Sequence, residues 1–246
     1  MKIALVCRGR TYSTAIGKSI ALKQNLEFTG NYLRLHHQLL LWYNHRPEYN
    51  ANNAYTKFTR TIQEETRNIF LKDNFLVKLF PSMLHFPPSL MVENATFDDV
   101  KNKFIFDTSV LNLNQYDRYY FLDRNFIYST LSWIYSCKIS YFHATKKHTK
   151  NYPKINIDKI DLARTKFYII EYFMQQKLRN YLDIKNIPYA YINENSYHEY
   201  IDAEKLDTVK TPINYENFIE NIDELYTFIN YWYPICEYET KNWSFY

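Results

Sequence analysis

Short apolar runs alternate along this chain with longer stretches of helical periodicity. Residues 2–7 form a buried-strand pattern with β-branched Ile3 and Val6, followed by a polar turn and a helical stretch over 14–24. Further strands are predicted at 26–35, 75–80, 103–107, 118–123 and 188–193, and further helices at 54–71, 125–139, 156–185 and 217–232. Alternating strands and helices predict an α/β fold in three layers, a central and mostly parallel sheet flanked by helices.

Composition and charge limit the classes of protein to which this chain can belong. The 246 residues, of which 46% are hydrophobic, are enough for a single domain over 1–246 with a sizeable core. No run reaches the roughly 18 apolar residues of a membrane span, and the apolar N-terminus is too short for a signal peptide, so a cytoplasmic protein is expected. The net charge of +4 suits an anionic ligand but is too small to indicate nucleic acid. Cys7, Cys137 and Cys236 lack metal-site spacing, so reduced thiols and no metal are expected.

The turn after the first strand is equipped to hold an anion. Ligands of parallel sheets lie at the carboxyl ends of the strands, and here residues 8–14 join such an end to a helix N-terminus. Unpaired backbone N–H groups and the helix dipole attract negative charge there, and Arg10 adds a cation. Ser13 or Thr14 is the expected N-cap.

Two nucleotide-binding families use a turn of this kind. A Walker A loop needs G-x-x-x-x-G-K-[ST]; Gly17-Lys18-Ser19 would supply its end, but Tyr12 replaces the first glycine and the register is about five residues late. The segment Arg10-Thr11-Tyr12-Ser13-Thr14 instead resembles the R-[ST]-G-[ST]-T loop of the sulfotransferases, which use PAPS (3′-phosphoadenosine 5′-phosphosulfate). It matches at four of five positions and in the correct register, with Tyr12 in place of glycine.

A second segment resembles the same family. Sulfotransferases bind the 3′-phosphate of PAPS through an arginine at the end of a later strand and a serine eight residues on. Here Arg124 follows the strand 118–123, and Ser132 stands eight residues later in the next predicted helix, with Ser129 as a fallback hydroxyl. The resemblance covers roughly residues 1–135 and implies a P-loop-like sulfotransferase fold with PAPS as donor and PAP as product.

The resemblance also implies catalytic roles. Arg10 would neutralise the leaving oxygen of PAP, and Lys78, in the strand 75–80, would stabilise the transferring sulfuryl group. The positions of the family's general base hold Phe80 and Asn31, neither of which accepts a proton. His36 is our candidate base by proximity, ahead of other nearby groups, which are His37, Glu27 and His85.

Three functions remain open at this point. The first is sulfuryl transfer from PAPS to a hydroxyl or amine of a small molecule or glycan, and the basic segment 138–154 could hold an anionic acceptor. The second is a P-loop kinase that uses Lys18 and Ser19 with a magnesium-side carboxylate at Asp107 or Asp123. The third is binding of PAPS or PAP without catalysis, by a non-catalytic relative of the sulfotransferases.

Overall fold

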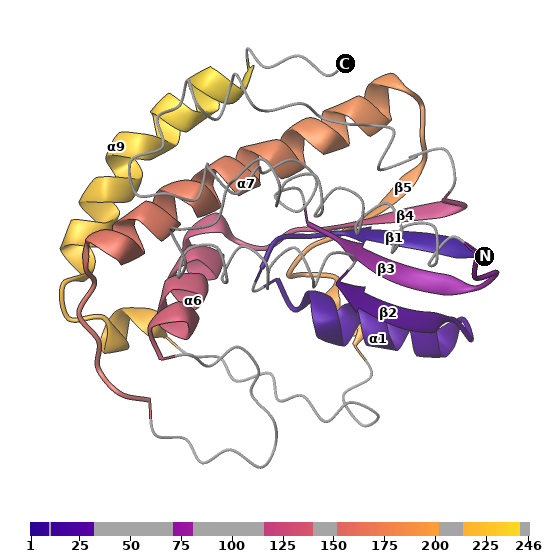
Figure 1. Ribbon diagram of the computed structural model, residues 1–246, viewed down its shortest axis with the longest axis horizontal. Coiled ribbons are helices and arrows are strands. Elements are labelled where there is room, and N and C mark those ends of the chain that lie inside the picture. The colour runs from indigo at the N-terminus through magenta and orange to yellow at the C-terminus, as the bar shows by residue number, and fades with distance from the viewer. Residues whose placement is uncertain (10, 32–70, 81–115, 140–151, 202–213, 242–246) are drawn as a thin grey trace, which may run out of the picture.

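A central sheet and five α-helices make up the described part of the chain. The computed structural model describes residues 1–9, 11–31, 71–80, 116–139, 152–201 and 214–241 (Figure 1). The strands are β1 (Lys2–Val6), β2 (Glu27–Asn31), β3 (Phe75–Leu79), β4 (Arg118–Leu122) and β5 (Tyr189–Ile192). The helices are α1 (Ser13–Lys23), α6 (Phe126–Lys138), α7 (Lys159–Ile184), α8 (Tyr197–Tyr200), α9 (Ile222–Lys241) and the 3₁₀ helix η4 (Tyr215–Phe218). The predicted helix 54–71 and strand 103–107 lie outside the described residues.

The five strands form one parallel sheet in the order β2-β3-β1-β4-β5. The central strand β1 pairs with β3 on one side and β4 on the other, and Ile3 to Val6 are fully buried. A strand covered on both faces reads as a continuous apolar run, which is why the sequence predicts this sheet. The expected α/β fold with a parallel sheet and flanking helices is confirmed.

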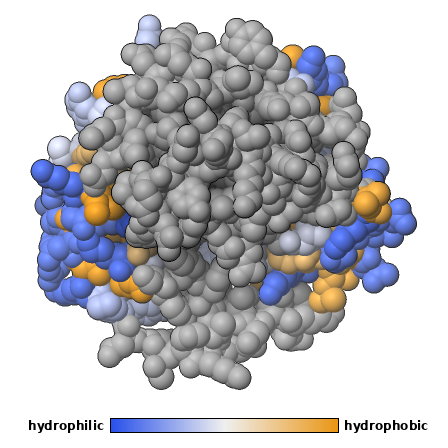
Figure 2. Space-filling view, viewed as in Figure 1, coloured by the Kyte–Doolittle hydropathy of each residue, from blue (hydrophilic) through white to orange (hydrophobic). Residues whose placement is uncertain are grey.

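Helices cover both faces of the sheet (Figure 1). Alternate side chains of β1, Ile3 and Leu5, pack in one cluster with Ile16 and Ile20 of α1. The long helix α7 runs along the opposite face, and α9 packs against α7 through a cluster that includes Met174. Hydrophilic side chains gather at both flanks of this view, over the α9 side and the α1 side, as expected of outer layers (Figure 2).

Helix boundaries follow local capping chemistry. Asn125 caps α6 by accepting a hydrogen bond of 2.9 Å from the Tyr128 N–H, and Asp158 forms a capping box with Asp161 at the start of α7.

The last helix differs from the prediction of 217–232. Tyr215–Phe218 is a 3₁₀ turn, and α9 begins only at Ile222 and continues to Lys241. No helix within the described ranges is long and apolar enough to cross a membrane.

The strand order brings two loops together at one edge. The chain leaves β1 toward β2 and leaves β4 toward β5, so neighbouring strands send their connections in opposite directions. Ligands of open parallel sheets bind outside the carboxyl ends of the strands at such a switch point. The loops after β1 and after β4, which carry the two motifs, are therefore neighbours.

Candidate functional site

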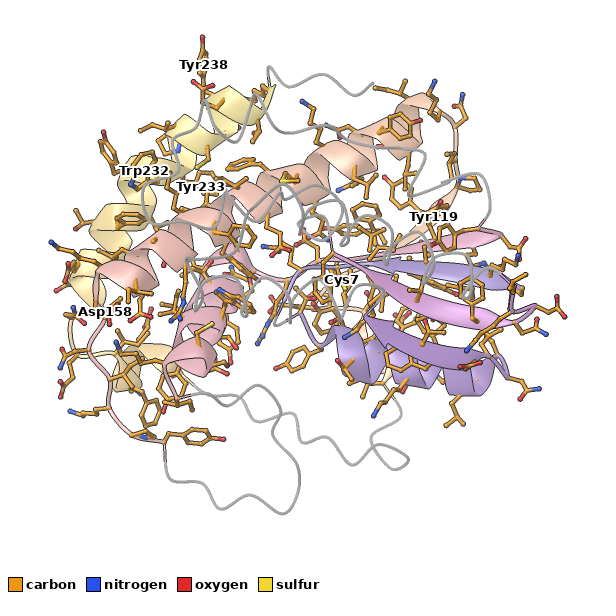
Figure 3. The ribbon with its side chains drawn as sticks, viewed as in Figure 1. Cys7, Tyr119, Asp158, Trp232, Tyr233 and Tyr238 are labelled. Carbon is orange, nitrogen blue, oxygen red and sulfur yellow. The ribbon has the colours of Figure 1, made fainter. Side chains whose placement is uncertain are left out.

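The loop after β1 enters α1 through a left-handed residue. The N-cap of α1 is Tyr12, with φ 58° and ψ 17°, and its side chain makes no capping bond. The prediction of Ser13 or Thr14 as N-cap is therefore wrong, because both residues lie inside the helix. The Ser13 hydroxyl is hydrogen-bonded to Cys7, and the Thr14 hydroxyl accepts from Lys78. Ser13 contacts the buried Cys7 sulfur, and burial raises the pKa of that thiol to about 12. Figure 3 shows Cys7 in the interior of the molecule, at the carboxyl end of β1.

Tyr12 takes the conformation that a glycine would supply. Left-handed backbone costs a non-glycine residue roughly 1 kcal/mol, whereas glycine adopts it freely. Position 12, where the R-[ST]-G-[ST]-T pattern has glycine, thus keeps a left-handed backbone despite the substitution. The Tyr12 ring is used instead, because it meets the Tyr197 ring edge-on with centroids 5.6 Å apart and lies against Arg124.

Arg124 joins the loop after β4 to the loop after β1. Its Nη2 donates to the Tyr12 hydroxyl at 3.2 Å, and its Cζ lies 4.4 Å from the Tyr12 ring centroid and 3.9 Å from that of Tyr128. Its Nε donates to Glu194 Oε1 at 3.2 Å, and only 5% of the side chain is exposed. Two motifs 112 residues apart in the chain are therefore in direct contact at the carboxyl edge of the sheet.

Lys78 brings a second predicted residue to the same loop. Its Nζ donates to Thr14 Oγ1 at 2.9 Å, at the start of α1. The Phe80 ring lies 5.4 Å from this ammonium, and the side chain is almost fully buried on β3. Burial lowers the pKa of Lys78, and the nearby charge of Lys18 lowers it further. The site thus has a poorly solvated cation at a helix N-terminus, where an anion is stabilised most.

Sequence reasoning missed Arg8, which is fully buried at the centre of this edge. Its Nε donates to Gln175 Oε1 at 2.7 Å, and its Nη2 donates to Asp123 Oδ1 at 2.6 Å and to the Arg124 carbonyl at 3.1 Å. The Tyr172 ring of α7 lies 4.6 Å from the guanidinium carbon. The available signal was positional, since Arg8 and Asp123 each follow a buried apolar strand, and these strands are neighbours.

The Arg8 contacts hold the peptide groups on both sides of Arg124 in place. Asp123 Oδ1 accepts the Arg124 N–H at 2.8 Å, while Arg8 binds the Arg124 carbonyl. Gln175 closes the network by donating to the Leu122 carbonyl at 2.8 Å. Arg8 is therefore a structural tie between β1, the turn after β4, and α7.

The hydroxyls predicted to assist Arg124 have partners within the protein. Ser132 Oγ donates to the Tyr215 hydroxyl at 3.1 Å, and Ser129 Oγ donates to the Phe126 carbonyl at 3.0 Å. Both serines are buried in α6. Ser132 could donate to a phosphate at Arg124 only if its O–H turned away from Tyr215, whose own hydroxyl would then donate to Ser132.

The remaining predicted residues divide into three groups. Thr11 is buried and donates to the Arg8 carbonyl at 2.8 Å, so its hydroxyl closes the turn. Glu27 begins β2 at the opposite, amino edge of the sheet and is ion-paired with Lys72, so it is remote from the site. The others lie outside the described residues; they are Arg10, His36, His37, His85 and Asp107.

The geometry gives little support to the hypothesis of a P-loop kinase. Lys18 is exposed in the second turn of α1, beyond the N-terminus where a Walker lysine meets phosphate. Gly17 has a packing role, because an added Cβ would lie 2.6 Å from Phe28 Cε2. Both oxygens of Asp123 are already bonded, one to Arg8 and the other to Tyr191 at 2.9 Å. Among the described residues, no group of three or more His, Cys, Asp or Glu side chains could hold a metal ion.

Comparison with known proteins leaves the family open. No family model matches the chain. No curated protein and no solved structure matches it either. The residues at the carboxyl edge of the sheet are therefore the main indication of function.

Proposed function

We propose that this protein transfers a sulfuryl group from PAPS to a hydroxyl or amine of a small-molecule or glycan acceptor. The observation that carries the proposal is the contact of Arg124 with Tyr12. PAPS has a 5′-phosphosulfate and a 3′-phosphate on one ribose, so it needs two anion sites a short distance apart. Lys78, on the Thr14 hydroxyl at the start of α1, and Arg124, in the turn after β4, supply cationic groups at the carboxyl edge of one sheet.

The two ends of the nucleotide take different parts of this edge. The 5′-phosphosulfate lies at the N-terminus of α1. The backbone N–H groups of the first turn are available to it there, together with the Thr14 hydroxyl and the Lys78 ammonium that is bonded to this hydroxyl. The 3′-phosphate lies at Arg124, whose guanidinium can pair two donors with two phosphate oxygens. Arg10, which precedes α1 in the sequence, completes the cradle in this proposal.

The transfer itself is an in-line displacement. The acceptor oxygen forms a bond to sulfur while the bond between sulfur and the bridging phosphate oxygen breaks, so the electron pair leaves with PAP and the acceptor proton passes to a base. Arg10 neutralises the charge that develops on the bridging oxygen, and Lys78 stabilises the sulfuryl oxygens, an effect that its near-complete burial strengthens. His36 remains the proposed base.

A second candidate, nucleotide binding without catalysis, is favoured by one observation. Phe80, at the position of the family's catalytic histidine, lies with its ring 5.4 Å from the Lys78 ammonium. A phenyl ring there accepts no proton. Binding without turnover is therefore the result that would select this candidate.

Calorimetric titration with PAP in the presence of EDTA tests the proposed donor. We expect PAP to bind without metal and Arg124→Ala to weaken binding at least tenfold, since loss of a charge-assisted pair costs about 1.5–3 kcal/mol. Arg118→Ala is the matched control, because Arg118 is exposed at the amino end of the same strand. Equal loss in both variants, or no PAP binding, would refute the proposal.

Two further experiments separate the alternatives, a titration with ATP and an assay of sulfuryl transfer. Magnesium-dependent ATP binding that Lys18→Ala abolishes would select the kinase instead. If PAP binds as expected, incubation of radiolabelled PAPS with a panel of hydroxyl and amine acceptors separates transfer from mere binding. Label that moves to an acceptor, and moves less in Lys78→Met, supports catalysis.

A further inference from the structure

Glu194 places a carboxylate on the arginine to which we assign the 3′-phosphate. It lies in the turn after β5, the strand beside β4, and therefore at the same carboxyl edge. Its Oε1 accepts from Arg124 Nε at 3.2 Å. The two side chains differ sharply in exposure, with 45% of Glu194 exposed against 5% of Arg124. A fixed cation is thus paired with a partly solvated anion.

The carboxylate takes half of the arginine's anion-binding edge. The Nε–H and Nη2–H of a guanidinium point the same way and together bind two oxygens of one anion. In Arg124 this pair of donors is divided, with Nε on Glu194 and Nη2 on the Tyr12 hydroxyl. The Tyr12 and Tyr128 rings lie over the guanidinium. A phosphate that used both donors would replace the Glu194 carboxylate and the Tyr12 hydroxyl on that edge.

We propose that Glu194 occupies the phosphate position of Arg124 in the ligand-free protein and is displaced when the ligand binds. This inference rests on the proposed function only in assigning a phosphate to Arg124. Glu194 thereby gives the buried guanidinium an anionic partner before binding, which offsets part of the desolvation cost of its charge. A dianion that engages both donors displaces a carboxylate that engages one.

Glu194 is suited to this exchange because little holds it. Within the described part of the chain, the contact with Arg124 is the one hydrogen bond of its side chain. An ion pair with one partly exposed member contributes little to stability. Arg124, in contrast, is held at its backbone N–H by Asp123 and at its carbonyl by Arg8. The glutamate therefore moves while the arginine stays.

The consequence is that Glu194 weakens binding of the 3′-phosphate and leaves binding of the 5′ end of the nucleotide unaffected. Glu194 repels any anion that approaches Arg124, so it opposes the 3′-phosphate of PAP but not AMP, which has a 3′-hydroxyl. Glu194→Gln keeps the side chain's length and removes the charge. We expect this variant to bind PAP about threefold to fivefold more tightly than the wild type, because an exposed ion pair that competes with the ligand is weak, and to bind AMP with unchanged affinity.

The test combines two titrations. In the first, inorganic sulfate is added to protein labelled with ¹⁵N-arginine, and the Arg124 Nε–H signal, assigned by its loss in Arg124→Lys, reports on this site alone. In the second, PAP and AMP are titrated by calorimetry. Glu199→Gln is the control, because Glu199 is an exposed glutamate on the neighbouring helix α8. Thermal melting confirms that each variant is folded.

Each outcome has one meaning. Tighter sulfate and PAP binding in Glu194→Gln, with Glu199→Gln unchanged, supports the inference. Unchanged or weaker sulfate binding in Glu194→Gln overturns it and makes Glu194 a positioning residue. Tighter sulfate binding without any PAP binding would keep the covered anion site and reject the PAPS-dependent function.

Discussion

At the scale of single residues, the buried Arg8 is the main determinant of how the two loops meet. Its guanidinium donates to Asp123, Gln175 and the Arg124 carbonyl, all at 3.1 Å or less. Such a buried charge is stable only while its partners remain, because desolvation of an unpaired ion costs several kcal/mol. The network is therefore a feature of the fold that also determines the position of a proposed ligand-binding group.

Arg8→Met leaves Asp123 without its strongest partner. We expect the free energy of unfolding to fall by about 3 kcal/mol, as for other broken buried ion pairs, and the additional change Asp123→Asn to recover part of the loss. Urea unfolding of the single and double variants measures both effects. The control is Arg164→Met, which removes a partly exposed arginine from Asp161 while Lys138 remains paired with that carboxylate; an equally small effect of Arg8→Met would contradict this role.

The left-handed backbone of Tyr12 leads to a second prediction, on the relative stability of glycine and alanine at this position. In most helical positions alanine is more stable than glycine by about 1 kcal/mol. At position 12 the order reverses, and Tyr12→Gly should unfold at higher urea concentration than Tyr12→Ala by roughly the same energy, because alanine must adopt positive φ.

The exposed Lys18, inside α1, supplies the matched comparison for this reversal. There Lys18→Ala should be the more stable of the pair with Lys18→Gly. If alanine is the more stable residue at both positions, the left-handed N-cap is not present in solution.

At the scale of elements, the approach of α1 to the sheet depends on Gly17. A Cβ there would lie 2.6 Å from Phe28 Cε2 and 3.2 Å from Leu5 Cδ2. We expect Gly17→Ala to destabilise the protein by about 1–3 kcal/mol through overpacking, although alanine favours helix. Combining it with Phe28→Leu should restore part of this loss in urea unfolding. Stabilisation by Gly17→Ala alone would show that α1 packs less closely than described.

The start of α7 gives stability that depends on pH. Hydrogen bonds from Lys138 and from the Asp161 backbone lower the pKa of Asp158 to about 2. A carboxylate with a depressed folded-state pKa stabilises fully above its unfolded value, near 4, and loses this contribution as pH falls toward 2.

We therefore expect the stability difference between wild type and Asp158→Asn to be larger at pH 6 than at pH 3, because asparagine still caps the helix but has no charge. Urea unfolding at the two pH values measures it. The comparison is repeated with Lys138→Met in both chains, where most of the pH dependence should vanish. An equal difference at both pH values would argue against the ion pair.

At the scale of the whole molecule, apolar periodicity predicted most of the described framework. The strands at 2–7, 75–80, 118–123 and 188–193 are all present, because a central parallel strand must be apolar on both faces. Helix ends were less predictable. The 3₁₀ turn before α9 and the left-handed N-cap of α1 depend on tertiary contacts, such as Tyr12 with Arg124, that no local pattern encodes.

The site was predictable only in part. Strand order placed Arg124 beside the loop after β1, and Lys78 meets Thr14 there. The position of Arg8 at a strand end was the available signal, but its partners were not predictable, because Asp123 and Gln175 are 115 and 167 residues away. The competing pairs of Glu194 with Arg124 and of Ser132 with Tyr215 likewise join distant segments.

The loops after β1 and β4 are proposed to bind opposite ends of one nucleotide. A crystal structure of the protein with PAP bound is the decisive test. We expect the 5′-phosphate at the N-terminus of α1, near Thr14 and Lys78, and the 3′-phosphate on Arg124 with Glu194 displaced. PAP bound elsewhere, or bound at α1 with Arg124 still paired to Glu194 and no phosphate upon it, would refute the proposal.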